Sequence, residues 1–120
     1  MNAMVHLGRA RLPDRRQGRT VSAVWNARGR ERPIDVSAGF FPGARVGELG
    51  RIGEVFAGVG KPDSTIDTML DEGCQLISRL LQRRVGLAEI AKGMAFDDAG
   101  RPETPRGVVG AALIEGEKTA

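Results

Sequence analysis

The sequence predicts one α+β domain: a three-stranded antiparallel sheet followed by a long helix and a shorter helix, both packed on one face of the sheet (β-β-β-α-α). Two observations predict this class. Apolar residues alternate with polar ones through the first half of the chain, and they recur every three or four residues in the second half. With 120 residues, 41% of them hydrophobic, the chain has enough apolar surface for one modest core.

Strand-like alternation occurs in three segments, and polar or glycine-rich turns separate them. The segments are residues 20–27, 34–40 and 51–59. A short polar turn containing Gly29 joins the first two, so we expect a hairpin there. The third segment carries apolar residues on both faces, which predicts the most buried strand of the sheet.

Helical periodicity follows the third strand. Apolar residues recur at spacings of three and four from Ile66 to Leu81, and Ser64 is suited to cap the start of this helix. We expect Gly86 to end it and residues 87–94 to form a shorter second helix. The apolar segment over residues 108–114 is suited to a short packing helix.

Positive charge is concentrated at the N-terminus. Residues 1–30 carry seven arginines and a single acidic residue, Asp14, although the net charge of the whole chain is only +3. We divide the chain into a basic arm (1–18), a domain (19–96) and a C-terminal turn with its packing segment (97–120). The arm suggests an acidic or polyanionic partner. A solvated, frayed terminus explains the same composition.

Cysteine and histidine usage excludes several classes of site. Cys74 is the one cysteine, so neither an intramolecular disulfide nor a thiolate zinc site is expected, and a reducing cytoplasm is the expected location. Its position on the apolar helix face predicts a core residue. His6 is the one histidine, so we expect no metal site and no cofactor. The absence of a long apolar run predicts a protein that is neither exported nor embedded in a membrane.

The junction between the third strand and the long helix is a candidate anion or nucleotide site. Gly60, Lys61, Ser64 and Thr65 combine glycine, a lysine and hydroxyls at the start of a helix, where backbone amides and the helix dipole favour anions. Pro62 follows the lysine, so the segment is not a Walker phosphate loop. A simply capped turn is the alternative interpretation.

The arginines of the arm are a candidate docking surface, and they are Arg11, Arg15, Arg16 and Arg19. They could contact the phosphates of a nucleic acid by charge. No aromatic residue is interleaved with them in the sequence to stack on bases. A protein partner or an intramolecular strut therefore remains open as well.

Several motifs resemble one known family in the same order along the chain. Residues 11–16 read R-L-P-D-R-R and are followed by Gly18 and Thr20; residues 50–56 read G-R-I-G-E-V-F; and Gly60 precedes Lys61. These motifs, with the helix over residues 80–90, resemble the TSCPD domain, the accessory module of adenosylcobalamin-dependent ribonucleotide reductases. The resemblance covers residues 11–94, about two thirds of the chain.

The resemblance implies a free-standing module linked to deoxynucleotide or DNA metabolism. Most such modules carry four cysteines suspected of binding a metal, whereas this chain has Cys74 alone, so no zinc role carries over. The reductase barrel and its radical, redox and cobalamin-binding residues have no counterpart in so short a chain. Ribonucleotide reduction is therefore not expected of it.

We expect an accessory or binding module rather than an enzyme. The sequence offers no nucleophile–base pair, no metal cluster and no complete phosphate loop, so no catalytic residue is predicted. The expected partners are a nucleotide or nucleic acid, or a ribonucleotide reductase or other protein of DNA metabolism. A small nucleic-acid-binding protein that uses the basic arm, and a homodimer paired through strand three or another sheet edge, are the alternatives.

Overall fold

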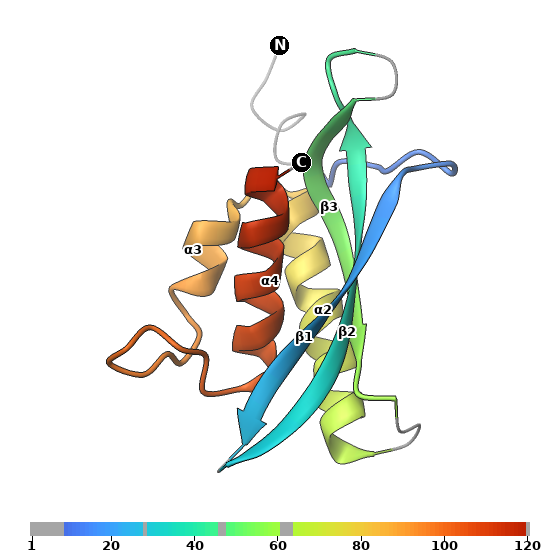
Figure 1. Cartoon of the computed structure of the whole chain (residues 1–120). Coiled ribbons are helices and arrows are strands. Elements are labelled where there is room, and N and C mark those ends of the chain that lie inside the picture. The colour runs from blue at the N-terminus through green and yellow to red at the C-terminus, as the bar shows by residue number, and fades with distance from the viewer. Residues whose placement is uncertain (1–8, 28, 46–47, 61–63, 120) are drawn as a thin grey trace.

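A computed structural model describes residues 9–27, 29–45, 48–60 and 64–119. The three strands form one sheet, and the helices cover one of its faces (Figure 1), so the predicted α+β class is confirmed. None of the described helices has the length and apolar character needed to cross a membrane. The elements are β1 (Gly18–Ala27), β2 (Arg30–Pro42), β3 (Leu49–Gly58), α2 (Thr65–Gln82), α3 (Leu87–Ala91) and α4 (Pro105–Thr119).

The sheet is antiparallel, with the strand order β1-β2-β3. Val21 pairs with Val36, and Val36 pairs in turn with Ala57, so these three residues share a level of the sheet. The tight β1–β2 turn uses Gly29 at φ +81, a conformation that glycine adopts without steric cost, as a hairpin requires. The Oδ1 atom of Asn26 accepts a hydrogen bond from the Gly29 amide, which helps to fix this turn.

The core lies between the sheet and the helices. In β1 and β2 every second residue points toward the helices, whereas in β3 a register irregularity turns both Ile52 and Val55 to that side. These positions meet the apolar faces of α2 and α4. The prediction that Cys74 is a core residue is confirmed, because only 2% of it is exposed. The buried core consists of Ile34, Val36, Phe40, Ile52, Val55, Leu70, Cys74, Ile77, Leu81, Leu87, Val108, Val109 and Leu113.

Helix α2 also covers the free edge of β3. The Ser78 hydroxyl accepts a hydrogen bond from the Val55 amide (2.9 Å) and donates one to the Val55 carbonyl (3.3 Å). The Gln82 side chain donates to the Gly53 carbonyl at 2.9 Å. Edge groups that would otherwise recruit another strand are thus bonded to a helix of the same chain.

The helix boundaries differ from those that the sequence predicts. Helix α2 ends at Gln82, before the expected stop at Gly86, and Arg84 adopts the left-handed conformation with φ +67. Gly86 instead precedes the first residue of α3. That second helix ends at Ala91, earlier than expected.

Helix α4 spans Pro105–Thr119, so it is longer than the short packing helix that the sequence suggests over 108–114. Pro105 suits a first helical position, and the Thr104 hydroxyl accepts a hydrogen bond from the Gly107 amide (3.1 Å). Glycines dilute the apolar pattern of this helix while allowing close packing. A Cβ atom at Gly110 would lie 2.7 Å from the sulfur of Met94.

The contact of α2 with the β3 edge makes a testable prediction. Replacing Ser78 with Ala leaves the partly buried amide and carbonyl of Val55 without partners, which should lower the free energy of unfolding by about 1–3 kcal/mol. Urea unfolding followed by circular dichroism measures the change. Gln75→Ala, which removes an exposed hydrogen bond on the same helix, should change stability by less than about 0.5 kcal/mol. Equal effects of the two substitutions would contradict the assigned role of Ser78.

Candidate functional site

The basic arm is bonded to the body of the domain. The Ala10 amide donates to the Gln82 carbonyl at 2.7 Å, and the Arg9 guanidinium donates to the side chain of the same glutamine. Arg16 forms a two-point hydrogen bond and ion pair with the Glu54 carboxylate. The arm therefore lies across β3 and the C-terminal end of α2, and two of its arginines act as intramolecular struts.

The Arg16–Glu54 pair is the strongest electrostatic contact of the arm. The Glu54 side chain is only 12% exposed, so its charge needs a bonded cation close by. Hydrogen bonding to Glu54 is the main cause that raises the pKa of Arg16. A Cβ atom at Gly39, on the neighbouring strand, would overlap the carboxylate, so this glycine makes room for the pair.

Docking of the arm creates an elongated groove made of two adjoining hollows of about 310 and 400 Å³. The hollows share Arg9, Glu54 and Gln82. We call these two hollows together the arm groove. Its charged lining consists of four arginines and two carboxylates, so the groove carries a positive balance; these residues are Arg9, Arg11, Arg16, Arg79, Glu54 and Asp71.

An exposed aromatic ring lines the same groove. Phe56 is 59% exposed and borders the hollow that Arg9 and Arg79 also line. The sequence predicts that Phe56 belongs to a strand buried on both faces, and this expectation is wrong at that residue. Val55 is buried against the helices, so its neighbour Phe56 points to the opposite face. Alternation counted from the buried Ile52 would turn Phe56 inward, and the register irregularity opposite Phe40 that reverses this has no clear signal in the sequence.

The predicted arm residues separate into two groups. Arg11 and Arg16 line the arm groove, and Arg15 is exposed beside them. Arg19 lies elsewhere, on the side of the sheet that faces the helices, with its guanidinium carbon 5.9 Å from the centre of the Phe40 ring. The structure thus brings together the first residues of the predicted docking surface, but not the last.

The strand-to-helix junction has the geometry of a capped turn in its described part. Ser64 accepts a hydrogen bond from the Asp67 amide (3.1 Å), and the Asp67 carboxylate accepts one from the Val59 amide (3.0 Å). An anion placed here would meet that carboxylate. Gly60 has φ +77 and Thr65 is exposed, while Lys61 lies outside the described residues. The predicted anion site stays a prediction.

Cys74 lines the groove, but its thiol is not a reactive group. Burial, and secondly the charge of Asp71, raises the pKa of its thiol to about 11. Within the described ranges, no group of three or more His, Cys, Asp or Glu side chains could hold a metal ion. The lining of the arm groove itself offers guanidinium groups and one exposed aromatic ring.

Comparisons of the chain with protein-family models, with curated proteins and with solved structures gave no match.

The arm contact can be tested with Arg16→Ala. Loss of the guanidinium leaves the mostly buried Glu54 carboxylate without its cation, so the arm should detach more often and be cleaved several-fold faster after Arg11 by trypsin. Mass spectrometry of the digest measures the rate. Arg15→Ala, which changes an exposed neighbour, should leave it unchanged. An arm that is cleaved equally fast in both variants would show that this ion pair does not hold it.

The raised pKa of Cys74 predicts slow alkylation and a pH-dependent stability. At pH 8 only about one thiol in a thousand is ionised, so iodoacetamide should label the folded protein far more slowly than the unfolded one.

The pKa of Cys74 in the folded protein lies above the ordinary 9.0, so the neutral thiol contributes to the free energy of unfolding. This contribution is complete below pH 9 and is lost as the pH rises to about 11. Urea unfolding across this range should show that decrease, and Cys74→Ala should reduce it. Rapid labelling of the folded protein at pH 8 would contradict the assignment.

Proposed function

We propose that this chain is an accessory module without catalytic activity of its own, and that it binds single-stranded nucleic acid in the arm groove. One observation carries the proposal: the exposed ring of Phe56 borders the same hollow as Arg9 and Arg79. Aromatic rings stack on unpaired bases of any sequence, and guanidinium groups bind the phosphates between them.

The distribution of charge in the groove supports a chain-like ligand. Arg11 continues the positive lining from the first hollow into the second, so phosphates along a strand meet successive arginines. Arg16 is not counted among the ligand contacts because its guanidinium is bonded to Glu54. A duplex keeps its base faces stacked inside the helix, so Phe56 should favour single strands. A mononucleotide offers the same chemistry with fewer phosphate contacts.

The proposed setting is deoxynucleotide or DNA metabolism in the cytoplasm. The resemblance of the sequence to the TSCPD module of ribonucleotide reductases supports this setting, and a reductase or another protein of that metabolism is the proposed protein partner. The single buried cysteine agrees with a reducing compartment.

Binding of a fluorescein-labelled oligothymidine at low salt, followed by fluorescence anisotropy, tests the proposal. Phe56→Ala should weaken binding about fivefold or more, because stacking on one aromatic ring contributes about 1–3 kcal/mol per base. If Arg9, Arg11 and Arg79 each neutralise one phosphate, the logarithm of affinity should fall with the logarithm of salt concentration at a slope of about −2, and Arg11→Ala should reduce that slope by about 0.7.

Matched controls separate stacking from general effects. Leu76→Ala removes a side chain of similar exposure, 57%, on α2 outside the groove, and Arg30→Ala removes a cation at the far β1–β2 turn. Both variants should bind oligothymidine with the affinity of the wild type. Lys61→Ala tests whether the strand-to-helix junction is a competing site. Binding of a duplex and of a deoxynucleoside triphosphate, compared with that of oligothymidine, tests which form of nucleic acid or nucleotide the groove prefers. Absence of oligothymidine binding at low salt, or equal affinity of Phe56→Ala and Leu76→Ala, would overturn the proposed function.

A further inference from the structure

The two edges of the sheet differ in their partners. Helix α2 bonds to the edge of β3, whereas in the described part of the chain β1 pairs with β2 alone. The register and the hydrogen bond from the Phe40 amide to the Gln17 carbonyl show that odd-numbered residues of β1 bond to β2. The backbone groups that point away from β2 are those of Gly18, Thr20, Ser22, Val24 and Asn26.

The open edge of β1 lacks the features that prevent strands from pairing. Its ten residues include one charged side chain, Arg19, and no proline, and its register with β2 is unbroken. Two apolar side chains along it are strongly exposed, Val21 by 47% and Val24 by 55%. A long, regular and nearly uncharged edge of this kind is a template for another strand.

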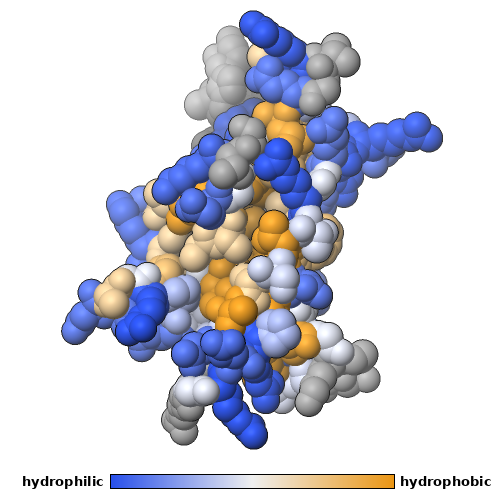
Figure 2. Space-filling model, viewed as in Figure 1, coloured by the Kyte–Doolittle hydropathy of each residue, from blue (hydrophilic) through white to orange (hydrophobic). Residues whose placement is uncertain are grey.

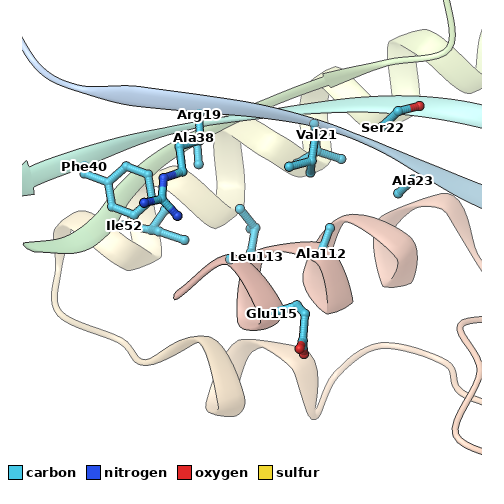
Figure 3. Close-up of a pocket in the computed structure, with 12 residues that line it drawn as sticks. Arg19, Val21, Ser22, Ala23, Ala38, Phe40, Ile52, Ala112, Leu113 and Glu115 are labelled. Carbon is cyan, nitrogen blue, oxygen red and sulfur yellow. The ribbon is translucent and has the colours of Figure 1, made fainter. Parts of the chain in front are cut away.

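An apolar groove of about 280 Å³ runs beside this edge, between β1 and α4. Figure 2 shows apolar surface on this side of the molecule, and Figure 3 shows Val21 and Ala23 of β1 facing Ala112 and Leu113 of α4. A strand added to β1 would therefore gain backbone hydrogen bonds and bury apolar side chains at the mouth of the groove.

We propose that β1 pairs antiparallel with β1 of a second copy of this chain, about a two-fold axis at Ser22, which joins two sheets into one of six strands. Only the register that places Ser22 opposite the partner's Ser22 engages all five outward-pointing residues of both strands. The contact is isologous, so it closes at two copies.

The side chains of β1 complement themselves in this register. On the side that faces the helices, Arg19 lies opposite the partner's Trp25, and Val21 opposite the partner's Ala23. On the uncovered face, Thr20 lies opposite the partner's Val24. No like charges meet, apolar groups meet apolar groups, and a guanidinium meets an aromatic ring, which is an attractive pair. The Trp25 ring is oriented by a hydrogen bond from its Nε1 atom to the Glu103 carbonyl at 3.3 Å.

Sedimentation equilibrium over micromolar to submillimolar concentrations tests the dimer. The wild-type chain should reach twice the mass of one chain, and Ser22→Pro should weaken association at least about tenfold, since it removes an outward amide and leaves the β2 ladder intact. Val24→Lys, which places a charged side chain on the pairing edge in place of a valine, should weaken it as well and provides a second variant if the proline disturbs folding. Phe56→Lys, on β3 away from the axis, should associate like the wild type.

Disulfide trapping tests the register. Paired residues of this kind have Cα atoms about 5.5 Å apart, within reach of a disulfide, so Ser22→Cys should cross-link two copies on mild oxidation. Ser37→Cys, on the same face but one strand inward, would lie about 20 Å from its counterpart and should not. The native Cys74 is buried and does not compete. A monomer at every concentration, or a dimer that neither Ser22 nor Val24 variants weaken and that Ser22→Cys does not trap, overturns the proposal.

Discussion

The contact between α2 and the edge of β3 is the constraint on which the rest of the structure depends. Two side chains one turn apart on the helix, Ser78 and Gln82, bond to the backbone of Val55 and Gly53, which sets the position of the helix along the strand. The same register directs the apolar face of α2 onto the sheet. Gln82 then has a second role, because its backbone carbonyl and side-chain oxygen receive the hydrogen bonds of the arm.

This constraint gives the molecule two unlike sides. On the β3 side, the arm and α2 cover the strand edge and leave a charged groove, with Glu54 fixing the position of Arg16 at its centre. On the β1 side, nothing in the described chain pairs with the outer edge, and α4 borders an apolar groove. One side has the chemistry to recognise a charged ligand, and the other has the regular, neutral backbone that recognises a strand.

The sequence predicted those parts of the fold that depend on local periodicity. Alternation located all three strands, and the spacing of apolar residues from Ile66 to Leu81 located α2. Helix α4 was underestimated because its glycines weaken the apolar pattern, although close packing against Met94 requires Gly110. The groove could not be predicted, since it depends on a tertiary contact that brings Arg9 beside Gln82 and, with it, beside the exposed ring of Phe56.

The two proposed surfaces are compatible because the sheet separates them. A two-fold axis at Ser22 joins the β1 strands at the centre of a six-stranded sheet, which leaves each β3 strand and its arm groove at an outer edge. Neither groove would be covered by the partner, so a dimer would present two separate ligand sites. If one nucleic-acid strand is long enough to reach both, the second contact becomes intramolecular and strengthens binding without any new interaction. Dimerisation through β1 would therefore raise the affinity for long strands over short ones, while each groove keeps its own chemistry.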